Sequence, residues 1–423
     1  MSFNLCIFVP YILDLIMKKI GILLTMTVVA ICSVAQNTVL SGTVVDDKTG
    51  ERITQANVSV SGTSIAVVTN DDGFFTLKTE ETPREIVISH IGYRPERLNP
   101  SQLSATNMTI RLKPATIQLQ EVFVWAEDPR QLVYTAIRKI PENYSRVPEL
   151  YHCFYRETAM KRQHFIYVAE GVVDMYKTAY DRSTARDRVA IRKGRRLLSP
   201  KKGDTLSVKV MGGPMQPIQL DLVKNTDFLL NAEELAYYDF KMEVPEVIAG
   251  RTQFVVGISP RALLPYPLFF GKLYIDCETK AFTRAELSLD VSDRQKATNF
   301  MLVSKPNGVR FRPRELSCLV DYRYEDGVTR ISYIRNTFRF NCDWKRRLFA
   351  TSFTAVCEMA VTDKTSNDVR PIPGRSSFDS RDAFYDRVEY FLDADFWKNY
   401  NIIEPTESLD KAIDKLMKSR VSP

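Results

Sequence analysis

The feature that most constrains this chain is a long succession of short apolar stretches separated by polar turns. Between residues 38 and 113, stretches such as 39–45 and 74–77 alternate with turns such as Asn70-Asp71-Asp72-Gly73. Glycine in such a turn adopts the positive φ that other residues avoid. Short strands at this spacing predict a seven-stranded type of β-sandwich at the N-terminal end.

From residue 151 to 361 the chain is again rich in stretches that alternate apolar and polar side chains. The segments 276–280 and 324–328 indicate hairpin turns, and the second contains Asp326-Gly327, a strong hairpin signal. Successive hairpins predict a larger, curved antiparallel sheet, half-barrel-like, with a few short helices. Residues 217–236 are the main interruption, and we expect a helix near 228–235.

The remaining segments connect or follow these β-rich regions. Residues 119–125 predict one more strand, and Asp128-Pro129 predicts a helix start with an N-cap and a proline at the first position. Residues 362–380 are polar and read as a surface linker. Helices are expected over 382–392 and after Ser408, which we expect to be the cap of the last helix.

The first residues have the pattern of an export signal. Lys18 and Lys19 precede the apolar run 20–32, and Ser33-Val34-Ala35 supplies the small residues of a cleavage site. We expect cleavage after Ala35, with residues 1–16 a possible misreading of the start codon upstream of Met17. An anchoring helix pair over 3–34 is the alternative.

The expected organisation therefore has five parts. They are a signal peptide over 1–35, a β-sandwich over 36–114, a strand–helix connector over 115–150, an antiparallel β domain over 151–361, and a linker with a helical tail over 362–423.

The balance of charged residues restricts the kinds of partner that the chain is expected to bind. The chain carries 58 lysines and arginines against 51 acidic residues, a mild excess of +7. Arg192, Lys193, Arg195 and Arg196 form one basic cluster, read either as a solvated loop or as a contact for anionic headgroups. Nucleic acid is not expected as the partner of an exported protein.

Five cysteines follow the expected cleavage site, at positions 153, 277, 318, 342 and 357. They form no Cys-x-x-Cys pair. Cys277, Cys318 and Cys342 alternate in phase with apolar neighbours, as Cys318 does with Leu316 and Val320. This placement predicts small buried core residues before disulfide halves.

Four motifs in order resemble the carboxypeptidase-regulatory-like domain, a family with a transthyretin-like (prealbumin-like) fold. They are G-T-V-V-D-D-K-T-G-E at 42–51, A-N-V-S-V-S-G-T at 56–63, T-N-D-D-G-F-F at 69–75 and H-I-G-Y at 90–93. Asn70 stands where the family commonly has aspartate. The resemblance implies a module without catalytic residues of its own.

Further segments resemble envelope proteins of Gram-negative bacteria in which this module is followed by a second β domain. They are 271–286, Asp128-Pro129-Arg130, Phe154-Tyr155-Arg156-Glu157 and 396–405. The first is also similar to strands of lipoprotein-carrier half-barrels. This resemblance implies an exported protein that is periplasmic, associated with the outer membrane or at the cell surface.

Signs of catalysis are sparse. The three histidines, His90, His152 and His164, have none of the spacings of zinc peptidases, and no Ser elbow, phosphate-binding or dinucleotide motif occurs. His152 and Cys153 are strand neighbours whose side chains point to opposite faces. Calcium in the turn at Asp71-Asp72 is an open alternative. We therefore expect no enzyme activity, no cofactor and no metal.

Aromatic side chains crowd one region and supply the candidate contact surface. They are Tyr237, Tyr238, Phe240, Tyr266, Phe269, Phe270, Tyr274 and Phe282. Either they form the core of the second domain, or they line an apolar concavity for a lipid or a partner protein. The sequence thus predicts a binding or scaffolding protein of the envelope. The alternatives are a carrier or sensor for lipid or glycan, and a carboxylate-based hydrolase.

Overall fold

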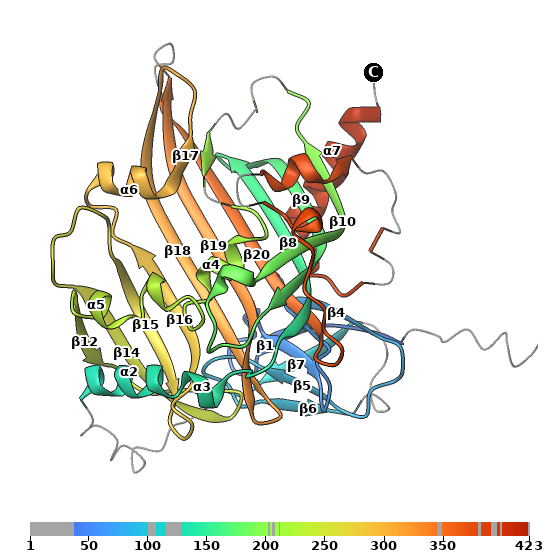
Figure 1. Ribbon diagram of the computed structural model, residues 1–423. Coiled ribbons are helices and arrows are strands. Elements are labelled where there is room, and N and C mark those ends of the chain that lie inside the picture. Colours follow the sequence, from blue (N-terminus) through green and yellow to red (C-terminus); the bar gives the residue numbers. More distant parts are fainter. Residues whose placement is uncertain are drawn as a thin grey trace, which may run out of the picture.

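The computed structural model describes residues 38–99, 107–115, 128–201, 204, 208–210, 212–344, 349–379, 382–390, 396–397 and 400–421. The expected signal segment 1–35 and the expected strand 119–125 lie outside these residues. A small β-sandwich lies at the lower end of a much larger sheet, and the red C-terminal segment runs beside that sheet to reach the sandwich (Figure 1).

The N-terminal lobe is a seven-stranded sandwich, as the turn spacing predicted. One sheet has the order β4-β1-β7, with β1 central, and the other has the order β3-β2-β5-β6. The strands are β1 (Thr38–Asp46), β2 (Asn57–Val60), β3 (Ala66–Val68), β4 (Phe74–Thr79), β5 (Ile86–Ser89), β6 (Glu96–Leu98) and β7 (Met108–Leu112). Alternate side chains, such as Val58, Phe75 and Ile88, fill the core between the two sheets.

The second lobe is a twelve-stranded sheet of order β12-β14-β15-β16-β18-β19-β20-β8-β9-β10-β21, with β13 paired to β14. Its strands are β8 (Glu149–Lys161), β9 (His164–Lys177), β10 (Arg188–Leu198), β12 (Tyr238–Met242), β13 (Glu246–Ile248), β14 (Arg251–Pro260), β15 (Phe269–Asp276), β16 (Phe282–Leu289), β18 (Val309–Glu325), β19 (Val328–Trp344), β20 (Thr351–Thr365) and β21 (Glu389–Tyr390). Pairing is antiparallel throughout except between β10 and β21. The predicted turn at Asp326-Gly327 joins β18 to β19, and both residues have positive φ.

The two faces of this sheet have different coverings. On β8, Cys153 and Tyr155 point to the inner face, whereas Phe154 and Arg156 point to the outer face. Residues from the segment 216–235 cover the inner face and join one large core with the strands. Cys153, Cys318, Cys342 and Cys357 are buried, Cys277 is partly buried against the core, and none of the five forms a disulfide, so the predicted core placement is confirmed.

Short elements connect and cover the strands. They are α2 (Pro129–Arg138), α3 (Ile140–Asn143), α4 (Gln216–Leu220), α5 (Ala232–Leu235), α6 (Arg294–Met301), α7 (Glu407–Val421), the 3-10 turns Thr184–Arg186, Thr226–Phe228, Gly374–Ser376 and Phe384–Arg387, and the strand pair β11 (Lys209–Val210) with β17 (Leu302–Ser304). The Asp128 side chain accepts hydrogen bonds from the N–H groups of Arg130 and Gln131, so the predicted cap of α2 is confirmed. Among the helices of the described residues, none has the length and apolar character that crossing a membrane requires.

Two expectations for the C-terminal region are wrong. Residues 384–387 form a 3-10 turn and 389–390 form β21, where a helix over 382–392 was expected. Phe384 and Val388 pack directly on Gly171 and Gly194, where a Cβ atom would have no room, and this contact holds the segment extended along β10. The cap of α7 is Thr406, whose hydroxyl accepts a hydrogen bond from the Leu409 N–H (3.1 Å), and not Ser408.

The turn at Gly73 generates a prediction about stability. Gly73 has a φ of 70°, and an added Cβ would lie 2.8 Å from the Val44 carbonyl oxygen. Gly62 has a φ of 74° but open space around it, so it is a matched control. We expect Gly62→Val to cost about 1–2 kcal/mol of unfolding free energy from backbone strain. Gly73→Val should cost roughly 1–3 kcal/mol more from overpacking.

Denaturant unfolding of the full chain measures both variants. Equal losses for Gly62→Val and Gly73→Val would mean that the close approach of Gly73 to β1 contributes nothing.

Candidate functional site

A row of alternating charges crosses the outer face of the large sheet. It consists of Arg335 on β19, Glu358 on β20, Arg156 on β8, Glu170 on β9 and Arg195 on β10, and we call it the charge ladder. Each residue stands directly opposite the next in the strand register. Because each charge has an opposite charge on the neighbouring strand, the ladder couples five strands of the sheet.

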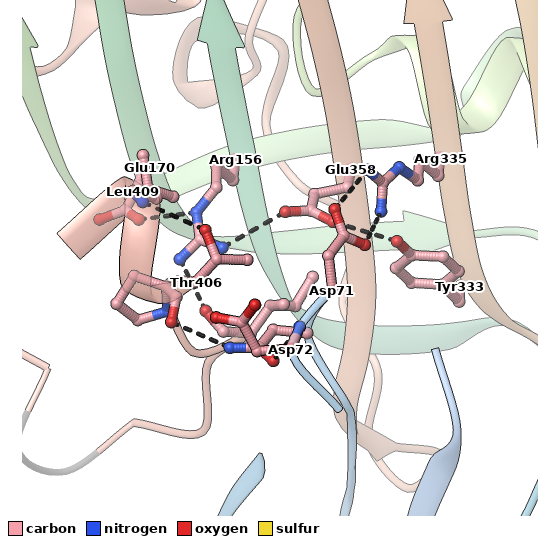
Figure 2. Close-up of polar contacts among 12 residues, drawn as sticks. Asp71, Asp72, Arg156, Glu170, Tyr333, Arg335, Glu358, Thr406 and Leu409 are labelled. Atoms are coloured by element: carbon pink, nitrogen blue, oxygen red, sulfur yellow. Dashed lines mark hydrogen bonds and ion pairs between the residues drawn. The ribbon is translucent and has the colours of Figure 1, made fainter. Parts of the chain in front are cut away.

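Arg156 occupies the centre of the ladder and donates hydrogen bonds from all three nitrogens of its guanidinium group. Its Nε donates to Glu170 Oε1 (2.7 Å), its Nη1 to Glu358 Oε1 (3.3 Å), and its Nη2 to the carbonyl oxygen of Ile403 (2.6 Å). Figure 2 shows these contacts beside the segment that leads to α7. The residue is 3% exposed, so these bonds replace water almost completely.

Glu170 is fully buried between two arginines. Its Oε2 accepts from Arg195 Nε (2.6 Å) and from the indole Nε1 of Trp397 (3.3 Å). Burial raises the pKa of the Glu170 carboxyl, but the charges of Arg156 and Arg195 outweigh burial and leave the pKa below its ordinary value. Glu170 is therefore a charged structural anchor.

The ladder reaches the sandwich through Arg335. Both Nη atoms of Arg335 donate to the Asp71 carboxylate, at 2.6 and 2.8 Å. Burial lowers the pKa of Arg335, yet the bonds to Asp71 and the nearby acidic groups leave it above its ordinary value. Three arginines and two glutamates in the ladder leave one positive charge, and Asp71 balances it.

Further contacts fix the sandwich to the sheet. The Ser64 hydroxyl donates to Asp363, Arg323 Nη2 donates to the Ser64 carbonyl oxygen (3.1 Å), and the Gly92 N–H donates to the Val247 carbonyl oxygen (2.8 Å). These bonds come from different sandwich turns. They therefore fix the orientation of the lobe as well as its position.

The C-terminal segment closes the junction from the other side. Asn401 bonds both backbone groups of Lys78 through its side-chain amide, at 2.8 and 2.9 Å, and so pairs with the edge strand β4 as a neighbouring strand would. Asn70 Nδ2 donates to the Pro405 carbonyl oxygen (2.9 Å), and Asp72 Oδ2 accepts from the Glu407 N–H (2.6 Å).

The motif Phe154-Tyr155-Arg156-Glu157 serves both faces of the sheet. Phe154 packs edge to face on Trp397, beside Arg156 on the outer face. On the inner face, Glu157 accepts hydrogen bonds from the hydroxyls of Tyr155 (2.6 Å) and Tyr167 (2.7 Å) and from the Gly213 N–H (2.7 Å). The motif is therefore structural on both faces.

The acidic turn considered for calcium is occupied by protein donors. Asp71 bonds Arg335, Asp72 bonds Glu407, and Asn70 Oδ1 accepts from the N–H groups of Asp72 and Phe74, both at 2.9 Å. Among the residues that the structure describes, no three His, Cys, Asp or Glu side chains gather as a metal site would require.

The structure separates the eight aromatic residues of the predicted contact surface. Tyr238, Phe269, Tyr274 and Phe282 are buried, so no partner can reach them in this structure. Tyr237 and Phe240 are partly buried against the core, while Tyr266 and Phe270 are 42% and 45% exposed.

The predicted basic cluster is engaged within the chain. Arg192 pairs with Asp174 (2.6 Å), and Lys193 Nζ lies 3.9 Å from the centre of the Phe396 ring. Arg195 belongs to the charge ladder, and Arg196 donates to the Tyr385 carbonyl oxygen. About half of the Arg192 side chain remains exposed, and Arg192 is the most exposed residue of the basic cluster.

His152 lies in a row that resembles an acyl-transfer triad. Its Nδ1 is 2.7 Å from Asp174 Oδ1, and its Nε2 is 3.2 Å from the Thr365 hydroxyl. However, Asp174 Oδ2 is paired with Arg192 at 2.6 Å. An arginine on this carboxylate opposes the charge support that a catalytic histidine receives from its partner acid.

Burial disfavours the charged thiolate form of four cysteines. Burial raises the pKa of the Cys318 thiol to about 12, and burial followed by Asp343 raises the pKa of Cys342 to about 12. Burial also raises the pKa of Cys153 and Cys357. A thiolate nucleophile is therefore disfavoured at these positions.

Comparisons with known proteins identify the N-terminal lobe. Residues 40–124 match the family model of the CarboxypepD_reg-like domain, as the four sequence motifs predicted. A 90-residue stretch, 21% of the chain, is 40% identical to the TonB-dependent receptor SusC of Bacteroides thetaiotaomicron. The matched stretch spans 8% of that receptor's length.

Solved structures also resemble the chain at low similarity. A DUF1329 family protein from Desulfovibrio piger has a TM-score of 0.24 and 10% identity, covering 58% of this chain and 95% of its own. A putative outer membrane lipoprotein-sorting protein domain from Vibrio parahaemolyticus has a TM-score of 0.25 and 9% identity, covering 59% and 96%. A LolA superfamily protein from Nitrosomonas europaea has a TM-score of 0.21 and 12% identity, covering 58% and 97%. TM-scores of this size carry no argument about function.

The charge ladder predicts that two arginines contribute very differently to the free energy of unfolding. Arg156→Met leaves Glu170 and Glu358 without their shared partner, and breaking a buried pair costs about 3–5 kcal/mol. Arg339 pairs with Glu315 at 3.1 Å, but their side chains are 59% and 36% exposed. Arg339→Met should therefore cost less than about 1 kcal/mol. Urea unfolding tests both, and similar losses would contradict the structural role of the ladder.

His90, a partly buried residue of the sandwich, predicts that the folding stability of the chain depends on pH. Burial, and then the positive charge of Arg284, lowers the pKa of His90 to about 4 from an ordinary value of 6.5. The unfolded chain thus binds more protons between pH 6.5 and 4, so folding stability falls as the pH drops through this window. The loss should reach roughly 3 kcal/mol at the acid end.

Urea midpoints of the natural chain and of His90→Leu, at pH 7 and pH 4.5, measure this contribution. The variant should lose less stability on acidification than the natural chain. An equal loss in both would place the acid sensitivity elsewhere.

Proposed function

We propose that this chain is a non-enzymatic binding or scaffolding protein of a Gram-negative cell envelope. It holds a partner protein at the periplasmic face of the outer membrane or at the cell surface, and its association with the membrane is peripheral. The export pattern before Gln36, the CarboxypepD_reg-like lobe and the similarity to SusC support this location. The division of the chain into the five parts expected from its sequence is part of the same proposal.

The observation that carries the proposal is the mutual satisfaction of charged groups at the junction. Arg156 bonds Glu170 and the carbonyl oxygen of Ile403 in the C-terminal segment. Glu170 also accepts from Arg195, and Arg335 bonds Asp71 of the sandwich, so these charges are satisfied within the chain. Such an arrangement makes the two lobes one rigid body. A rigid body suits binding, because little ordering entropy is lost when a partner docks.

The turn between β14 and β15 supplies an accessible apolar surface. Leu263 is 98% exposed, and Tyr266 and Phe270 are exposed to nearly half. Pro265 and Pro267 flank Tyr266, fix two backbone φ angles and so stiffen the turn. Exposed apolar side chains held on a stiff turn are typical of protein contact sites.

The test is capture of envelope partners by chemical crosslinking followed by purification. The triple variant Leu263→Ser, Tyr266→Ser and Phe270→Ser should fold normally, because these side chains are exposed, yet lose its captured partner. We expect binding to weaken at least about thirtyfold, equivalent to roughly 2 kcal/mol of contact energy.

The matched control is Val303→Ser with Phe349→Ser, which removes apolar side chains that are 60% and 80% exposed, on β17 and just before β20. This control should capture the same partner as the natural chain. Full capture by the triple variant would refute the proposed surface. Native mass spectrometry of the purified chain tests the carrier alternative, since retained lipid or glycan would favour it.

A further inference from the structure

A cleft of about 900 Å³ lies beside the ends of β8 and β9. Residues from three segments line it, within 146–148, 176–188 and 371–374. Its volume falls within the range of sites that hold small molecules. It lies apart from the proposed partner surface at Leu263 and from the charge ladder.

The lining of the cleft is strongly positive. Arg146, Arg182, Arg186 and Arg188 line it, against the single carboxylate of Asp181. Asp181 lies 3.6 Å from Arg182, but the two side chains are 52% and 76% exposed. Water screens such a contact strongly. Four positive charges against one negative charge leave a net charge of +3 in the lining.

Neutral acceptors position two of these arginines. Arg146 Nε donates to the Pro141 carbonyl oxygen (2.6 Å). Arg188 Nη1 donates to the carbonyl oxygens of Ala185 (2.7 Å) and Asp187 (2.8 Å). A carbonyl oxygen orients a guanidinium group without cancelling its charge. Both side chains therefore keep donors and a full charge for an anionic ligand.

A buried lysine supports the wall of the cleft formed by Thr178 and Ala179. Lys224 Nζ donates to the carbonyl oxygens of Thr178 and Ala179 and to the Thr178 hydroxyl, and it lies 3.3 Å from Asp187 Oδ1. Asp187 Oδ1 in turn accepts from the Thr178 N–H and hydroxyl, both at 2.9 Å. This part of the cleft is therefore held in one geometry before any ligand arrives.

We propose that this cleft binds a saccharide that carries a phosphate or carboxylate group. The planar guanidinium groups match the paired oxygens of such an anion. Ser183 offers its hydroxyl to the sugar, while Pro148 and Ile372 offer apolar contact to its C–H faces. The anionic group of the saccharide supplies the negative charge that balances the arginines of the lining.

Isothermal titration of the full chain tests the site with glucose 1-phosphate and with a hexuronate oligosaccharide. The natural chain should bind at least one of these probes, and its affinity should fall with added salt. The double variant Arg182→Glu with Arg186→Glu should weaken binding at least tenfold. Both side chains are exposed, so the variant should keep the natural thermal midpoint.

Arg294→Glu is the matched control, because it reverses an exposed charge on α6 outside the cleft. It should leave the affinity unchanged. A parallel arm uses vesicles of phosphatidylglycerol. Binding to vesicles with none to either soluble probe would overturn the saccharide assignment, as would failure of the natural chain to bind any probe or an equal loss in Arg294→Glu. Partner capture through Leu263 is measured separately, so the two proposals can fail independently.

Discussion

The contact on which the rest of the structure depends is the buried pair of Arg156 and Glu170. Removing two charges from water is costly, and their attraction offsets that cost only when every donor and acceptor has a partner. Here the ladder supplies those partners on both sides. Arg195 bonds the second oxygen of Glu170, Glu358 accepts from Arg156 Nη1, and the Ile403 carbonyl oxygen accepts from Arg156 Nη2. Loss of one charged residue of the ladder leaves the opposite charges beside it buried without a partner.

The ladder also explains how three distant parts of the chain meet. Arg335 carries it to the Asp71 turn of the sandwich (Figure 2). Trp397 and Ile403 bond Glu170 and Arg156, and so bring the C-terminal segment over the centre of the ladder. An apolar cluster of Phe154, Trp397 and Ile403 covers the polar row. Water is excluded from the pair of Arg156 and Glu170, which strengthens it. The pair of Arg335 and Asp71 contributes to a fixed orientation of the sandwich on the sheet.

Much of the architecture followed from local sequence patterns. The sandwich turns, the Asp326-Gly327 hairpin, the cap at Asp128 and the core cysteines are all set by neighbours within a few residues. The ladder could not be predicted in this way. Arg156 and Glu358 meet because β8 pairs with β20, about two hundred residues further along the chain, and one sequence does not reveal that register. A possible signal was an arginine or glutamate in phase with apolar residues, as Arg156 is with Phe154.

The aromatic residues show in the same way what the alternation of apolar and polar residues cannot predict. Alternation indicates which side chains share a face, but it does not reveal that residues 216–235 fold back over the inner face. The arginine cleft was missed for a related reason, since Arg146 is far in sequence from Arg182 and Arg186.

Differential scanning calorimetry of the chain tests the central claim, that the sandwich, the large sheet and the tail behave as one body. The account predicts a single transition in which the calorimetric and van't Hoff enthalpies agree. Two resolved transitions, with the sandwich melting separately from the sheet, would contradict it.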